Sequence, residues 1–297
     1  MPPHRLPANS PIGTFILRLL VIISLCSTPL TVVSQADEAT PIQVKQGDIA
    51  YLTLKLEPEV QSVRGKFLNE SIPFFKKGEG EFAAIIGIDL AQAVGPQPLS
   101  VTWKKGGSIG TEKYLLHIVP ASFGTEKLTL PKKMVDLDPP TLARVEREKQ
   151  QMLTLFDTSA GQRLWEGDFV VPTEGKIRGS FGQSRIMNGQ PRNPHTGEDI
   201  SAPLGAPVLA SNGGKVIMVG DYYFNGNSIV IDHGLGLFSM YFHLSKIAVK
   251  EGDQVVKGQT IGSVGQSGRA TGPHLHWGMR LNGARVNPFS LVEKKLG

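Results

Sequence analysis

The chain has 297 residues, enough for about two domains of roughly 100–200 residues each. Hydrophobic residues make up 40% of it, an ordinary share that excludes a disordered or fibrous chain. The formal charge is +5; Arg5 and Arg18 supply two of these charges in a first stretch of 36 residues without acids, which leaves +3 for the rest. A balance this mild gives no reason to expect a nucleic-acid partner.

The first 36 residues have the order of a secretory signal. Two arginines flank or enter an apolar run at residues 15–25, and the small residues Ser34 and Ala36 precede a possible cleavage point. The apolar run is short for a spanning helix. We therefore expect residues 1–36 to be a signal peptide that directs the chain to the periplasm or cell envelope. An uncleaved anchor is the alternative, and only then is membrane contact expected.

The only cysteine, Cys26, lies inside this segment. Cleavage would leave a mature chain without cysteine, so neither a disulfide nor a thiolate ligand is expected. Any bound metal would then depend on histidines and carboxylates.

Residues 37–122 read as a small β-sandwich. Short apolar segments alternate with turn signals such as Gly78–Gly80 and Gly106–Gly107, which is typical of sandwiches. The expected strands include residues 49–56, 82–88, 99–103 and 114–119. No charged or aromatic constellation in this part indicates catalysis, so we interpret it as a binding or spacing module.

Residues 123–165 form an expected linker with a short helix. Pro131, Pro139 and Pro140 interrupt the segment, and Thr141 is a candidate N-cap for the helix that follows. Apolar residues at Leu142, Val145, Met152 and Leu155 alternate with charges, which favours an amphipathic helix packed on a domain.

Residues 166–297 are rich in glycine and β-forming residues, and no long segment has helical periodicity. The expected strands are residues 175–181, 207–210, 215–219, 228–232, 237–243, 259–264 and 274–281. The sequence therefore predicts a mainly β protein with a C-terminal antiparallel β domain, preceded by a small β-sandwich and a short helical linker.

Five of the seven histidines fall in the C-terminal domain, and four of these five lie in three short motifs. The motifs are His195-Thr-Gly-Glu-Asp199, Tyr241-Phe-His-Leu-Ser245 and Gly272-Pro-His-Leu-His-Trp277. Residues two apart on a strand share a face, as do residues four apart, so His274 and His276 aim together and so do His195 and Asp199.

Two imidazoles and a carboxylate are a common ligand set for catalytic Zn²⁺, with a fourth position left for water. Not every one of the four candidate donors has to be a ligand, and a histidine near neutral pH also suits proton transfer. A lone histidine on a strand is more often structural, and we assign no role to His233. Three motifs in one β domain favour the metal interpretation.

With these motifs, residues 175–290 resemble the catalytic domain of the lysostaphin/LytM-type metallopeptidases. The family's His-x-Gly-x-Asp, His-Leu-Ser and Gly-Pro-His-Leu-His motifs occur in order, with matching context at Gly179-Ser-Phe-Gly182 and Val286-Asn-Pro288. The resemblance covers about two-fifths of the chain. It implies a zinc endopeptidase that cuts stem or cross-link peptides of bacterial peptidoglycan, with residues 166–297 as the zinc peptidase domain.

By this resemblance, His195, Asp199 and His276 are the zinc ligands, and His243 and His274 are the catalytic pair beside them. Some family members use a tyrosine shortly before the first ligand histidine to hold the oxyanion. No tyrosine lies between Phe181 and His195, so that role stays unassigned.

Two other function classes are alternatives. A catalytically silent wall-binding activator of other hydrolases is the closer alternative, and the complete set of motif residues argues against it. Residues 250–259 also resemble the hairpin of a biotin or lipoyl carrier domain, but no lysine there has the setting that such modification needs.

The segment before the catalytic domain suggests regulation. We expect residues 37–165 either to cover part of the groove over the metal or to present the groove to a regulatory partner. A passive spacer is the alternative.

Overall fold

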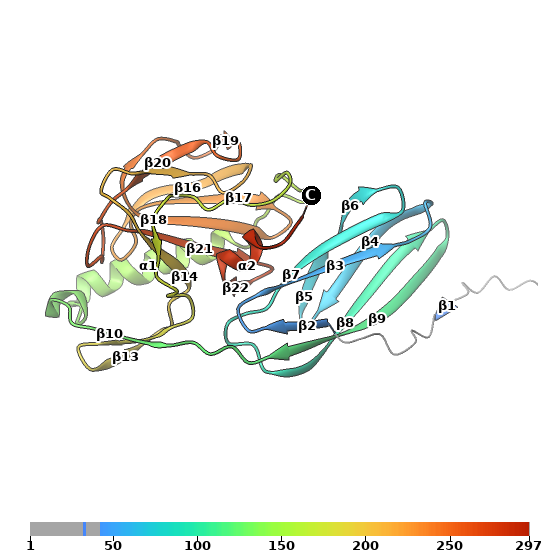
Figure 1. Cartoon of the computed structure of the whole chain (residues 1–297), viewed down its shortest axis with the longest axis horizontal. Helices are drawn as coiled ribbons and strands as arrows, with labels where there is room; N and C mark the ends of the chain where they lie inside the picture. Colours follow the sequence, from blue (N-terminus) through green and yellow to red (C-terminus); the bar gives the residue numbers. More distant parts are fainter. Residues whose placement is uncertain (1–31, 34–41, 297) are drawn as a thin grey trace, which may run out of the picture.

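The computed structural model describes residues 32–33 and 42–296, and it is built almost entirely of β-strands. Two β units lie side by side, joined by an extended segment and one long helix (Figure 1). The expected mainly β fold is confirmed. Most of the expected signal peptide, including Cys26, lies outside the described residues; the two described residues, β1 (Val32–Val33), pair with β9.

The N-terminal unit has two sheets that face each other across one apolar core. One sheet contains β1, β9 (Ser108–Val119), β8 (Gly95–Lys105), β4 (Val60–Phe67) and β5 (Glu70–Pro73), with β2 (Ile42–Lys45) also on β9. The other contains β3 (Ile49–Lys55), β7 (Glu81–Gly87) and β6 (Phe75–Gly78). Leu99 and Leu116 of the first sheet and Ala84 and Ile86 of the second belong to this core.

The connecting segment contains β10 (Thr125–Leu128), the 3₁₀ turn η1 (Lys132–Met134) and helix α1 (Pro139–Leu155). The expectation that Thr141 caps the helix is wrong. Asp138 is the N-cap, and its carboxylate accepts the Thr141 N–H at 2.8 Å. Pro139 and Pro140 belong to the first turn because proline's fixed φ suits a position whose N–H needs no helical partner.

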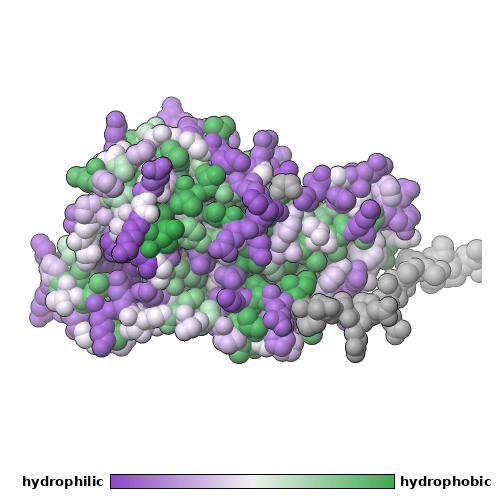
Figure 2. All heavy atoms as spheres, in the orientation of Figure 1, coloured by the Kyte–Doolittle hydropathy of each residue, from purple (hydrophilic) through white to green (hydrophobic). Residues whose placement is uncertain are grey.

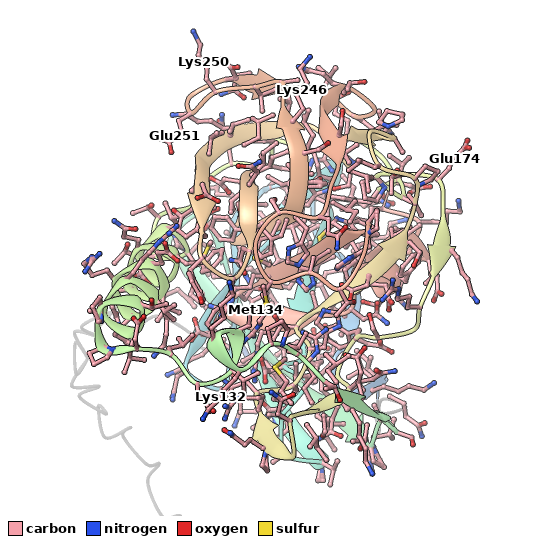
Figure 3. All side chains as sticks on the ribbon, turned by 90° about the vertical axis from the view of Figure 1, so that its left-hand side faces the viewer. Lys132, Met134, Glu174, Lys246, Lys250 and Glu251 are labelled. Atoms are coloured by element: carbon pink, nitrogen blue, oxygen red, sulfur yellow. The ribbon has the colours of Figure 1, made fainter. Side chains whose placement is uncertain are left out.

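Helix α1 packs against the C-terminal unit, as its amphipathic pattern predicts. Met152, Leu155 and the following Phe156 contact a small cluster that includes Phe238 and Met240. Figure 3 views the molecule from the side of α1, and Lys132 and Met134 of η1 lie below the large strands of the C-terminal unit in this view. Among the described residues, no helix is long and apolar enough to cross a membrane.

The C-terminal unit is a ten-stranded antiparallel sheet. Its main order is β11 (Lys176–Ile177), β14 (Gly197–Ser201), β21 (Leu275–Leu281), β18 (Leu237–Ile247), β17 (Gly226–Gly234), β16 (Gly214–Tyr222) and β19 (Gln254–Val255). β20 (Thr260–Val264) pairs with β15 (Pro207–Leu209) and β18, β22 (Ala284–Val286) pairs with β21, and helix α2 (Pro288–Val292) follows. Figure 2 shows hydrophobic residues gathered over this sheet on the viewed face.

The strand expected at residues 175–181 is much shorter in the structure. β11 ends at Ile177, because Gly179 and Gly182 have φ values of 65° and 76° that turn the chain away from the sheet. Beyond this turn, β12 (Ser184–Met187) and β13 (Gln190–Arg192) form a hairpin, and β10 adds to it in parallel as a third strand. The sequence analysis did not predict this small sheet.

The two units share an apolar interface through β7. Its residues alternate between cores: Ala84 and Ile86 face the sandwich, whereas Ala83 and Ile85 belong to the core of the C-terminal unit with Trp165. Both faces of β7 are thus buried, which explains its nearly continuous apolar sequence. An interface of this kind holds two domains in one arrangement.

A charged pair completes the interface. Arg285 donates from Nε and Nη2 to the Asp89 carboxylate at 2.9 and 2.6 Å, and its backbone N–H donates to the same group at 2.9 Å. Burial alone would raise the pKa of the Asp89 carboxyl, but the hydrogen bonds from Arg285 hold that pKa below its usual value.

We predict that Asp89→Ala lowers the free energy of unfolding by about 1–3 kcal/mol, since it leaves a partly buried guanidinium without its charged acceptor. Thermal or denaturant unfolding of the full chain measures the change. The matched control is Lys105→Gln, which removes an exposed pair with Glu57 and should cost no more than about 0.5 kcal/mol. Equal losses in the two variants would contradict the structural role of Asp89.

Candidate metal centre

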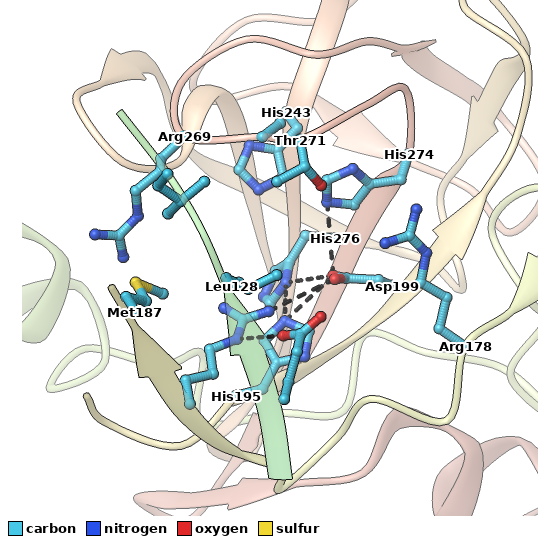
Figure 4. A pocket seen from close by; sticks show the side chains of 14 residues that line it. Leu128, Arg178, Met187, His195, Asp199, His243, Arg269, Thr271, His274 and His276 are labelled. Carbon is cyan, nitrogen blue, oxygen red and sulfur yellow. Dashed lines mark hydrogen bonds and ion pairs between the residues drawn. The ribbon is translucent and has the colours of Figure 1, made fainter. Parts of the chain in front are cut away.

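The predicted site residues lie together at the bottom of one pocket (Figure 4). Its walls come from the linker, from the β12–β13 hairpin and from loops of the large sheet. The lining residues are Glu126, Leu128, Leu130, Arg178, Arg185, Met187, His195, Asp199, His243, Arg269, Ala270, Thr271, His274 and His276.

Strand pairing brings the two outer motifs together. β14 and β21 are antiparallel, and Asp199 lies directly opposite His276, so their side chains share a face. His195 reaches the same point from the residues just before β14. Gly197 makes the approach possible, because a Cβ there would lie 2.6 Å from the His276 ring.

Three donor atoms converge at this point. His195 Nε2 lies 3.2 Å from Asp199 Oδ1, His276 Nδ1 lies 3.0 Å from the same oxygen, and the two ring nitrogens are 2.8 Å apart. All three side chains are buried. His195 Nδ1 lies 3.1 Å from the Ser180 carbonyl oxygen; because a carbonyl only accepts, the ring donates its Nδ1–H and Nε2 keeps its lone pair. This set of two imidazole nitrogens and one carboxylate oxygen, with His195 oriented by the Ser180 carbonyl, fits a zinc ion.

The electrostatics keep the set in the form that binds a cation. Burial alone would raise the pKa of the Asp199 carboxyl, but hydrogen bonds with His195 and His276 lower it far below its usual value. Burial lowers the pKa of His276 to about 4. At neutral pH the carboxyl is therefore ionised, and the His276 ring is neutral.

His243 and His274 lie beside this cluster with ring centroids 4.7 Å apart. The Nδ1 atoms of both rings face backbone carbonyls, of Ser267 for His243 and of Gly272 for His274, each at 2.8 Å. Both rings thus donate from Nδ1 and keep Nε2 as a free acceptor. His274 Nε2 is 3.8 Å from Asp199 Oδ1.

The backbone of His243 is unusual, with φ of +62°. A residue with a side chain adopts this left-handed conformation at a cost, which structures retain mainly at functional sites. Burial, followed by repulsion from the neighbouring His276 and His274 rings when they are protonated, lowers the pKa of His243 to about 3.

The structure brings together all five residues that the sequence analysis selected. His233 lies apart from these five residues. Its Nδ1 lies 2.6 Å from the Gly213 carbonyl oxygen, and its Nε2 lies 2.7 Å from Ser239 Oγ. Its ring is fully buried in the core and does not line the pocket.

The sequence analysis gave no role to Ser180 and Glu198, yet these residues support the site. The buried Glu198 carboxylate accepts from the Ser180 N–H and hydroxyl at 2.7 and 2.9 Å and from the Phe181 N–H at 3.3 Å. The same contacts hold the Ser180 carbonyl against His195. Both residues were visible within the quoted motifs, but only the folded structure shows that they meet.

The linker also lines the pocket; the sequence analysis expected residues 37–165 to cover part of the groove but did not identify which linker residues would do so. Glu126, Leu128 and Leu130 alternate with exposed residues, so one face of β10 and its extension forms a wall of the pocket. Asn188 fixes this wall: its side chain accepts the Leu130 N–H and donates to the Leu130 carbonyl, both at 2.9 Å.

Comparison with known proteins agrees with this geometry. A model of Peptidase family M23 matches residues 193–288. The crystal structure of an M23 peptidase candidate from Pseudomonas aeruginosa is 31% identical with a TM-score of 0.65, and the match covers 85% of this chain and 95% of that one.

Two curated proteins match the C-terminal unit. Peptidoglycan DD-endopeptidase ShyA of Vibrio cholerae is 41% identical over 120 residues, 40% of this chain and 28% of ShyA. DD-carboxypeptidase/endopeptidase Mpg of Neisseria meningitidis is 46% identical over 98 residues, 33% of this chain and 23% of Mpg. The chain thus matches less than a third of either protein's length, whereas it covers nearly all of the Pseudomonas relative. With that relative and the family model in agreement, the chain belongs to peptidase family M23, the lysostaphin/LytM-type metallopeptidases that its motifs resemble.

Proposed function

We propose that this chain is a zinc-dependent endopeptidase of the bacterial cell envelope that hydrolyses stem or cross-link peptides of peptidoglycan. The observation that carries the proposal is the convergence of His195 Nε2, Asp199 Oδ1 and His276 Nδ1 beside two imidazoles with free Nε2 atoms. The names of ShyA and Mpg support the substrate class. The signal-like order of residues 1–36 supports the location.

In this proposal His195, Asp199 and His276 hold the zinc ion. Bound zinc polarises the carbonyl of the scissile bond and lowers the pKa of the attacking water. Asp199 contributes Oδ1, and its other oxygen lies 3.7 Å from Arg185 Nη2, which helps to keep the carboxylate ionised and oriented.

His243 and His274 then serve proton transfer. Each ring has its Nδ1–H fixed by a backbone carbonyl, so only Nε2 is available to take a proton from the attacking water or to pass one to the leaving amine. Neither ring needs to rotate between the two steps. Once a ring of this pair is protonated, its Nε2–H can also donate to the negative charge that develops on the carbonyl oxygen of the scissile bond.

The silent-activator alternative differs at this site. A protein that only binds the wall has no need for a buried cation site with two oriented imidazoles. We therefore favour the enzyme, and the alternative becomes an outcome of the first experiment.

We predict that full-length protein purified without added metal contains one zinc ion per chain, and that it releases peptide-cleavage products from isolated peptidoglycan. Removal of the metal by a chelator should abolish release, and added zinc should restore it, because a bound ion would activate the attacking water. Elemental analysis and chromatography of the wall fragments measure both. Metal-free protein that stays active would contradict the zinc role. Sugar fragments with intact peptides would contradict the bond, and bound zinc without any cleavage would favour the silent activator.

We also predict that the five residues divide into two groups. His276→Ala should lose zinc and activity together. His243→Ala and His274→Ala should keep zinc but lower turnover by roughly 10²-fold or more, a usual effect of losing acid–base help. Zinc content and turnover measured on the same preparations test the division. If His274→Ala empties the site while His276→Ala retains zinc, the roles within the pair are reversed.

We propose in addition that the linker restricts entry to the site. Leu128 and Leu130 line the same pocket as the metal cluster, and the sandwich behind them is held by an apolar interface. A partner that binds the N-terminal unit could shift this wall and regulate access.

Leu128→Ala should therefore speed wall digestion about fivefold at unchanged zinc content, the effect of about 1 kcal/mol on the barrier to entry. The control is Thr129→Ala, whose side chain is exposed on the other face of the same segment. Equal rates for Leu128→Ala and the control would remove the restricting role. A slower Leu128→Ala enzyme would show that the linker contributes to substrate contact.

A further inference from the structure

Three arginines surround the mouth of the metal pocket. Arg178, Arg185 and Arg269 line it together with only two carboxylates, of Glu126 and Asp199 (Figure 4). Once a divalent ion is bound, the pocket carries a clear excess of positive charge. Such a pocket attracts an anionic ligand and disfavours a neutral one.

Two of these arginines already have partners. Arg185 Nε donates to Glu126 Oε2 at 3.0 Å, and Arg185 Nη2 lies 3.7 Å from Asp199 Oδ2. Arg269 Nη1 donates to the Met134 carbonyl at 3.2 Å, and its guanidinium lies 3.8 Å from the centre of the Phe224 ring. Both side chains brace the linker or the loops of the pocket.

Arg178 differs from the other two. In the β11–β14 pair Ile177 lies opposite Ile200, so the next residue, Arg178, lies across from Asp199, and its N–H donates to the Asp199 carbonyl at 3.1 Å. Residues opposite each other on antiparallel strands point to the same face, which here is the metal side. Figure 4 shows the guanidinium directed into the pocket.

The guanidinium of Arg178 has donors to spare. Its Nε donates to Ser201 Oγ at 2.7 Å, which fixes the side chain and leaves both terminal amino groups available. Within residues 32–33 and 42–296, no carboxylate pairs with it. A planar guanidinium held in this way binds a carboxylate through two parallel hydrogen bonds.

We propose that Arg178 is a specificity-determining residue that binds a free carboxylate of the substrate, on the residue that supplies the leaving amine. The inference rests on the proposed peptidase function. The α-carboxyl of the acyl residue is consumed in the scissile bond, so a free α-carboxylate beside that bond belongs to the other residue. A diamino acid linked through its side-chain amine has this chemistry, because its own carboxyl group stays free.

The test uses two synthetic cross-linked peptides that differ only at this carboxyl group, which is free in one and a carboxamide in the other. Full-length zinc-loaded protein should cleave the free acid with a kcat/KM about 10- to 100-fold higher, the usual worth of a hydrogen-bonded charge pair. Arg178→Gln should lose this preference by slowing only the free acid. Arg178→Lys should recover part of it, and Lys176→Gln, two residues away and outside the pocket, should behave like the wild type.

Equal cleavage of both peptides by the wild type would overturn the proposal, and so would an Arg178→Gln variant that slows both alike. Cleavage of neither peptide would count against the hydrolytic function itself. In that case calorimetric titration of the same two peptides decides about Arg178. Tighter binding of the free acid by the wild type, lost in Arg178→Gln, supports the carboxylate site, and equal binding rejects it.

Discussion

The pairing of β14 with β21 is the constraint on which the rest of the site depends. It sets Asp199 opposite His276, and the neighbouring pairing of β21 with β18 sets Phe242 opposite His276. Strand side chains alternate, so a slip of one residue would turn the carboxylate to the other face of the sheet and remove it from the imidazoles. The buried apolar residues of the same strands, such as Leu275 and Trp277, resist such a slip, because it would expose them.

Backbone carbonyls of three loops then decide the chemical state of the histidines. Ser180, Ser267 and Gly272 each offer a carbonyl oxygen to the Nδ1 atom of one ring. An acceptor at Nδ1 forces the proton onto that atom, and the opposite nitrogen is left to bind or to accept. Glycine-rich loops therefore matter here because they fix tautomers as well as turns. Glu198 extends the same control one step outward, since it holds the loop that contains Ser180.

The sequence predicted the metal cluster well for a physical reason. Each motif is short, and alternation along a strand pairs His274 with His276 and His195 with Asp199 without knowledge of the fold. The choice of His195, Asp199 and His276 as ligands came from the family resemblance. The linker wall could not be found in this way. Residues 125–128 contain one apolar side chain, and their partner β12 lies about sixty residues further along the chain. Such non-local pairing leaves no periodic signal. The helix start, by contrast, could have been predicted from local sequence. An Asp before two prolines is a recognisable N-cap, and Asp138 precedes Pro139 and Pro140.

The double burial of β7 has a consequence for how the molecule comes apart. One strand contributes Ala84 and Ile86 to one core and Ala83 and Ile85 to the other. If one core unfolds, the other loses the β7 side chains that cover it. We therefore expect the two units to unfold together as a single cooperative unit. If proteolysis released the C-terminal unit, the apolar surface around Trp165 would be exposed, and we expect the released unit to associate. A strand outside the metal site thus contributes to the stability of both units.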